Sequence, residues 1–79
     1  MTQQEIISSI QELMRIFFRD EALTISMSTS ANDIDDWDSL NHMTLISEIE
    51  KKFNVQFEFF EIMDFENIGE LVNSIQTKL

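Results

Sequence analysis

The side chains that could do chemistry gather between Asp33 and His42, a stretch with four Asp residues, one Ser and the only His of the chain. The acidic run first suggests a calcium loop, because Ca²⁺ binds carboxylate oxygens at alternating positions. Counted from Asp33, however, Asp38 stands where that loop needs Gly, and Thr44 stands where it needs a bidentate Glu. The spacing excludes an EF-hand, so we predict no metal site and a solvated loop.

His42 is the remaining candidate for catalysis. A metal site or an activated nucleophile would need a second imidazole or a Cys, and the chain has one His and no Cys. His42 is expected at the surface, away from the helix face of Leu40 and Met43, with contact to a partner as the alternative. Because no acid–base constellation is present, we predict that the chain is not an enzyme.

Ser39 differs in its setting, because its hydroxyl stands at the start of a predicted helix, directly after a long loop and beside Asp38. One interpretation is that Ser39 simply caps the helix. The other is that it is modified, since a phosphate esterified there would meet the positive end of the helix dipole and unpaired backbone N–H groups. Residue type and position alone leave both interpretations open.

The first element that positions this stretch is an amphipathic helix from Thr2 to about Phe18. Its apolar residues recur at steps of three and four, and Thr2 with Glu5 forms a capping box. From Arg19 to about Asp38 the period is lost and Ser, Thr, Asn and Asp predominate, which predicts a long loop. Apolar residues are expected to hold this loop on the core: Leu23, Ile25, Met27 and Ile34.

Three further helices are predicted at Ser39–Phe53, at about Phe59–Met63 and from Asn67 to near Leu79. Their expected caps are Asp38 before the second helix, Asn54 at its end, and Asn67 with Glu70 at the start of the last. Phe57 and Phe65 are assigned to the core. Four Met residues are assigned as core fillers: Met14, Met27, Met43 and Met63. The fold class is therefore all-α, a small bundle of three main helices and one short third helix, with a long loop between the first two.

Length and charge limit the kinds of partner that this chain can have. At 79 residues and 43% hydrophobic, it should form one globular domain, residues 1–79, with a small core. Fifteen acidic residues against five basic ones give a net charge of −10, which disfavours nucleic acid and favours basic faces of proteins. Without Cys, a signal peptide or a membrane-spanning run, we expect a cytoplasmic monomer that does not insert into membranes.

From Asp36 to Phe57 the sequence reads DWDSLNHMTLISEIEKKFNVQF, with Asp-Ser-Leu at the start of the second helix. This segment resembles the prosthetic-group segment of acyl carrier proteins. The acidic loop before it and the run from Ile68 to Ile75 after it stand in the order that this family has. The resemblance implies that Ser39 carries 4'-phosphopantetheine, transferred from coenzyme A by a phosphopantetheinyl transferase that uses magnesium. Acyl groups would be held as thioesters on this arm while acyl-transferring, condensing or ligating enzymes act on them.

The same resemblance implies roles for residues around Ser39. Asp38 would be the acidic neighbour that helps the transferase dock, and Leu40 would be an apolar contact beside the arm. One group of side chains would form the helix face that partners recognise: Asp38, Met43, Ser47 and Glu50. Another group would lie at the mouth of the acyl pocket: Ile62, Phe59 and Phe60.

Departures from the pattern of primary fatty acid carriers suggest a particular kind of pathway. Asp36 stands where those carriers usually have Gly, and the second helix is less acidic at Asn41, Thr44 and Lys51. The sequence is more similar to stand-alone carriers of specialised bacterial pathways, such as lipid, polysaccharide or secondary metabolite assembly. Two alternatives stay open, namely an aminoacyl or peptidyl carrier and an unmodified helical adaptor with the same fold.

Overall fold

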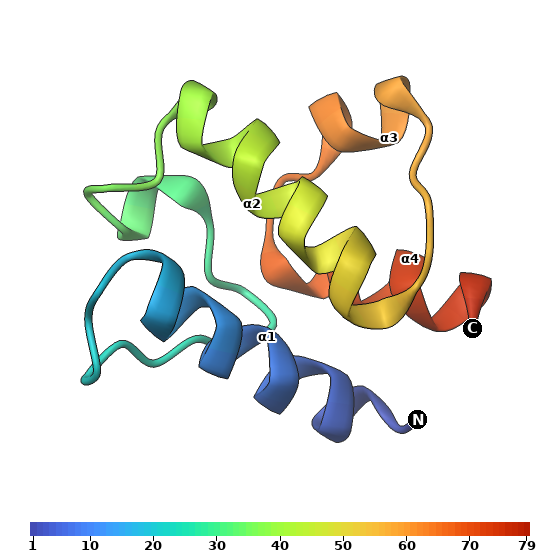
Figure 1. Ribbon diagram of the computed structural model, residues 1–79, viewed down its shortest axis with the longest axis horizontal. Helices are drawn as coiled ribbons and strands as arrows, with labels where there is room; N and C mark the ends of the chain where they lie inside the picture. The colour runs from blue at the N-terminus through green and yellow to red at the C-terminus, as the bar shows by residue number, and fades with distance from the viewer.

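The structure is a computed structural model that describes residues 1–79. Helix α1 spans Gln3–Phe17, α2 spans Ser39–Phe53, the short α3 spans Phe59–Asp64 and α4 spans Ile68–Lys78. The all-α fold and the order of one short and three longer helices are as predicted (Figure 1). A single 3-10 turn at Ala31–Asp33, which the sequence analysis did not predict, interrupts the long loop.

Local hydrogen bonds set the ends of these helices. The Thr2 hydroxyl accepts from Glu5 N, while the Glu5 carboxylate accepts from Thr2 N, so α1 begins with the predicted capping box. Asn54 ends α2 in the left-handed conformation, with φ 55° and ψ 48°. At the start of α4, Asn67 Oδ1 accepts from Glu70 N at 2.9 Å. The predicted cap residues are confirmed, but α4 has only half of a capping box, because the Glu70 carboxylate accepts from Glu66 N instead of Asn67 N.

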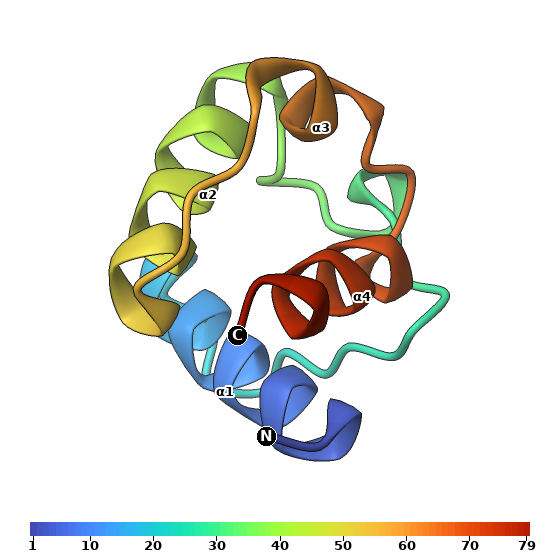
Figure 2. The same ribbon diagram turned by 90° about the vertical axis from the view of Figure 1, so that its right-hand side faces the viewer.

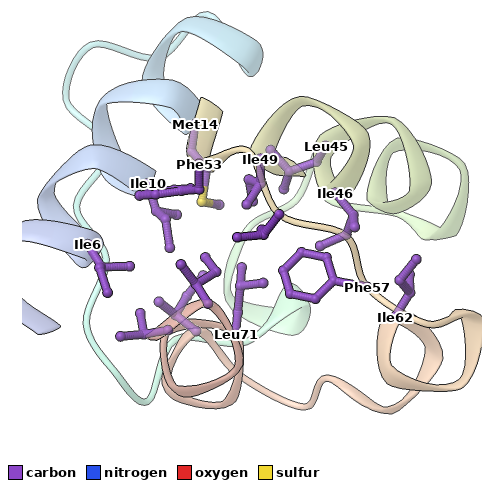
Figure 3. Packing of buried hydrophobic residues seen from close by; sticks show 14 of the residues in the cluster. Ile6, Ile10, Met14, Leu45, Ile46, Ile49, Phe53, Phe57, Ile62 and Leu71 are labelled. Atoms are coloured by element: carbon purple, nitrogen blue, oxygen red, sulfur yellow. The ribbon is translucent and has the colours of Figure 1, made fainter. Parts of the chain in front are cut away.

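The core lies between α1, α2 and α4, whose apolar stripes face one another (Figures 2 and 3). Its fully buried members come from all three helices: Ile6, Ile10, Met14, Leu45, Ile46, Ile49, Ile68, Leu71, Val72 and Ile75. In both views α3 lies at the opposite end of the molecule from α1 and next to the start of α2. Of the two Phe residues assigned to the core, Phe57 is buried and Phe65 is half-buried against it.

The Met assignments were correct only for Met14. Met27, Met43 and Met63 are 37%, 41% and 61% exposed, so they do not fill the core. Because mainly Ile and Leu side chains fill the small core, these Met side chains are left at the surface.

Backbone and side-chain hydrogen bonds hold the loop between α1 and α2 on the bundle. Ile25 N donates to Gln11 Oε1 at 2.9 Å, and the first amides of α4 donate to loop carbonyls, Ile68 N to Thr29 and Gly69 N to Met27. Leu23, Ile25 and Ile34 pack against the core as expected, whereas Met27 contributes its carbonyl rather than its side chain. The loop therefore serves as part of the cap of α4.

The two ends of the chain lie side by side, at the opposite end of the molecule from the start of α2 (Figures 1 and 2). Gln3 Nε2 donates to Asn73 Oδ1 at 2.7 Å, and Gln76 Nε2 donates to the Met1 carbonyl at 3.4 Å. In none of the helices is an apolar stretch long enough to cross a bilayer.

Candidate functional site

The start of α2 presents Ser39 as an exposed residue that does not cap its own helix. Asp38 is the N-cap, and its Oδ1 accepts from Asn41 N at 2.8 Å. Ser39 is therefore the first helical residue, and its backbone N–H is among those that an α-helix leaves without an internal partner. The interpretation of Ser39 as the helix cap was therefore wrong, and its side chain is exposed.

The loop residue Trp37, two residues before the start of α2, is buried and is hydrogen-bonded to His42. The indole Nε1 donates to His42 Nδ1 at 3.0 Å, and the two rings are nearly parallel, with an interplanar angle of 28°. On its other side His42 Nε2 lies 3.0 Å from the carbonyl oxygen of Ile62 in α3. The expectation that His42 lies at the surface was wrong, because both ring nitrogens have partners within the chain and the side chain is half-buried.

A cavity of about 330 Å³ opens beside Ser39, between the first turns of α2, the loop and α3. Most of its lining residues are apolar. The lining residues come from four segments: Ala31 and Trp37; Asp38, Ser39, His42 and Met43; Ile62 and Met63; and Phe65, Glu66, Asn67 and Leu71. An exposed hydroxyl at a helix N-terminus, next to a cavity of this kind, fits a phosphodiester-linked arm.

The structure places some of the predicted site residues together and others apart. Ile62 and Met43 line the cavity, and Leu40 lies beside Ser39 with 79% of its surface exposed. Phe59 and Phe60 are exposed on α3 and are not among the lining residues, because only the face of α3 with Ile62 and Met63 turns toward the cavity. Sequence reasoning did not assign His42, Met63 or Phe65 to this site, since their contacts depend on how α3 packs.

Two of the residues expected to contact partners differ in their surroundings. Ser47 is exposed on α2. Glu50 is half-buried, and its Oε2 accepts from Phe57 N at 2.8 Å, so its carboxylate holds the connection to α3. This bond leaves the Glu50 carboxylate less free to pair with a partner's cation.

From Asp33 to Asp38, four acidic residues precede Ser39 in the loop. Asp33, Asp35, Asp36 and Asp38 are all exposed, and together we call them the acidic approach. Asn41 Nδ2 donates to the Asp36 carbonyl at 2.7 Å, which ties the last part of this loop to the first turn of α2. No group of three or more His, Cys, Asp or Glu side chains is arranged to hold a metal ion.

Comparison with known proteins gives this arrangement a family. Residues 4–75 match the family described as "Phosphopantetheine attachment site". Over 79 residues, the full length of both chains, the sequence is 28% identical to an acyl carrier protein of Exiguobacterium sibiricum. The solution NMR structure of a holo acyl carrier protein from Geobacter metallireducens superposes with a TM-score of 0.85 at 34% identity, covering 92% of this chain and 84% of that chain.

Both the sequence and the four-helix fold of this chain are thus matched by known proteins. The chain belongs to the phosphopantetheine-attachment family and, within it, to the acyl carrier proteins. Its cofactor is a covalently attached 4'-phosphopantetheine, and its family is one of carriers rather than catalysts.

Proposed function

We propose that Ser39 is the attachment residue and that residues 1–79 form one stand-alone carrier domain. This proposal rests on one observation: Ser39 is exposed at the first position of α2, while Asp38 makes the capping bond. The Ser39 hydroxyl is therefore available. When bound, the arm supplies the thiol that this Cys-free chain lacks. The chain's own residues orient the arm and present it to enzymes.

In this proposal the surroundings of Ser39 divide into an electrostatic part and an apolar part. The acidic approach attracts the basic face of a phosphopantetheinyl transferase and later of acyl-transferring, condensing or ligating enzymes. Exposed Leu40 and Met43 give these enzymes an apolar contact beside the arm. Ile62, on the wall of the cavity, would meet an acyl group that folds back from the arm.

We further propose a specialised pathway, with the protein acting as a cytoplasmic monomer. The support lies on α2, where Asn41 is bonded to the Asp36 carbonyl and Lys51 pairs with Glu48 at 3.6 Å. Asn41 and Lys51 are two of the positions where the sequence departs from primary fatty acid carriers, and a neutral and a basic side chain there make the face of α2 less acidic. Analysis of the thioester cargo on protein purified from its own host tests this assignment and separates acyl from aminoacyl or peptidyl carriers.

The attachment itself is tested by mass spectrometry of the intact protein. Incubated with coenzyme A, Mg²⁺ and a broad-specificity phosphopantetheinyl transferase, the wild type should gain the mass of one arm. Ser39→Ala should gain nothing, whereas Ser8→Ala, which removes an exposed hydroxyl on α1, should behave as wild type. A wild type that stays unmodified with several transferases would contradict the proposal and favour an unmodified adaptor.

A further inference from the structure

His42 joins two elements that the sequence separates widely. Its partners are Trp37, five residues before it, and Ile62, twenty residues after it. These partners indicate the tautomer of the ring. An indole N–H can only donate, so Nδ1 must be the unprotonated acceptor, and a backbone carbonyl can only accept, so Nε2 must carry the proton.

The bond from His42 to Ile62 completes the end of α3. The Ile62 carbonyl belongs to the last turn of α3, where carbonyls have no partner inside the helix. Helix α3 is otherwise tied by Glu61 to Ser74 and Lys78 of α4, so His42 supplies the direct hydrogen bond between α2 and α3. The position of α3 relative to the start of α2 therefore depends on this imidazole.

Both partners of His42 are walls of the cavity beside Ser39. Trp37 lies two residues before Ser39 in the loop, and Ile62 lies on α3. Figure 1 shows that the start of α2 and α3 lie at the same end of the molecule. Losing either bond would remove the hydrogen bond that joins one of these walls to the His42 side chain.

We propose that His42, as the neutral tautomer with its proton on Nε2, is a positioning residue that holds the Trp37 loop and α3 as one unit around Ser39. Its two bonds fix the shape of the cavity and the approach to the attachment hydroxyl. The part of this inference that concerns arm transfer rests on the proposed function of Ser39. The part that concerns the tautomer and the two bonds does not.

The structural part is tested on the unmodified protein by ¹⁵N NMR of the imidazole. At pH 8, above the range in which histidine ordinarily becomes protonated, the spectrum should show the Nε2–H tautomer, and the Trp37 indole proton should exchange slowly. The Nδ1–H tautomer, or a ring that interconverts freely between tautomers, would overturn the inference whatever happens at Ser39.

Two substitutions separate the two bonds. His42→Asn keeps an acceptor near Nδ1 and loses the donor to Ile62, whereas His42→Gln keeps an amide donor near Nε2 and loses the acceptor for Trp37. Exchange of the Trp37 indole proton should speed up by about three- to tenfold in His42→Gln and little in His42→Asn. The carbonyl ¹³C shift of Ile62 should move in His42→Asn and little in His42→Gln. Equal effects of both substitutions on both probes would contradict the proposal.

The functional part is tested by the kinetics of arm transfer. For His42→Ala, which removes both bonds, kcat/KM should fall by about three- to tenfold, mainly through a higher KM, because the hydroxyl is presented less well while the chemistry is unchanged. Ser8→Ala, at an exposed position of α1 outside the site, is the control and should equal wild type. If His42→Ala unfolds, His42→Asn and His42→Gln give the same comparison. Wild-type transfer rates in all three His42 variants would refute the positioning role, whereas an unmodified wild type would refute the attachment proposal instead.

Discussion

Asp38 combines a structural and an electrostatic contribution in one carboxylate. Its Oδ1 caps α2 through Asn41 N, and its charge lies directly beside Ser39 in the acidic approach. Asn caps helices about as well as Asp, whereas Ala costs about 1 kcal/mol. Asp38→Asn should therefore leave the free energy of unfolding within about 0.5 kcal/mol of wild type and lower kcat/KM for arm transfer. Asp38→Ala should lower both quantities.

Urea unfolding and transfer kinetics on the same two variants separate these contributions. Transfer at the wild-type rate by Asp38→Asn would show that the charge of Asp38 is not used in docking. A loss of stability in Asp38→Asn as large as that in Asp38→Ala would show instead that the cap needs the charge.

Glu61 links α3 to α4 and makes stability depend on pH. The backbone N–H of Glu58, with Lys78 and the Ser74 hydroxyl, lowers the pKa of Glu61 from its ordinary value of 4.5. A carboxyl with a lowered pKa in the folded state adds stability above its unfolded pKa and loses that contribution as the pH falls through the folded pKa. Glu61→Gln should thus have a lower urea midpoint than wild type at pH 7, and the difference should shrink below about pH 4.

The control for this measurement is Glu12→Gln, which neutralises an exposed carboxylate on α1. Glu12→Gln changes the net charge as much as Glu61→Gln does, but it leaves the bonds of Glu61 in place. Its urea midpoint should therefore not fall at pH 7, and its difference from wild type should not depend on pH in the same way. A Glu61→Gln difference of constant size from pH 7 to pH 3 would rule out this assignment.

At the scale of elements, the contact between the loop and α4 depends on Gly69. An added Cβ there would lie 2.8 Å from the Met27 carbonyl oxygen and 3.2 Å from Asn67 Oδ1, and both belong to the cap of α4. Gly69→Ala should therefore destabilise the fold by about 1–3 kcal/mol, although Ala is otherwise the better helix former. Urea unfolding measures this loss, with Gln76→Ala on the same helix expected to stay within about 0.5 kcal/mol. Stabilisation by Gly69→Ala would mean that the loop can move away freely.

Most of the helix boundaries could be predicted because they depend on bonds between residues that are close in sequence. Thr2 with Glu5, Asp38 with Asn41 and Asn67 with Glu70 each act over three residues. The surroundings of His42 could not be predicted in this way, since Ile62 is twenty residues distant and reaches it only through packing of α3. The exposure of Met27 and Met63 was missed for a related reason. Residue type alone does not show which apolar side chains fill the core and which are left at the surface.

At the scale of the whole molecule, charge should govern how fast partners are met. The net charge of −10 combines with an acidic approach at Ser39, so association with a basic enzyme face should be faster at low ionic strength. Between about 0.05 M and about 0.3 M salt, kcat/KM for arm transfer should fall by about threefold or more. Replacing Asp35 and Asp36 by Asn should weaken the salt dependence of kcat/KM. Replacing Glu12 and Glu21 by Gln removes the same charge elsewhere and should weaken it less. Identical salt dependence in the two double variants would assign the effect to net charge alone.

The neighbouring chain ends have a consequence for architecture. Met1 and the last turn of α4 are in hydrogen-bond contact, and both lie far from the start of α2 (Figure 1). A second polypeptide could be joined at either end, and the domain could also be inserted into another polypeptide through its two ends. In both cases Ser39 would still face outward. The same arrangement permits circular permutation, with the old ends joined by a short linker and new ends opened in the exposed stretch around Glu21 and Ala22. The domain can thus be tethered through its ends without covering the start of α2.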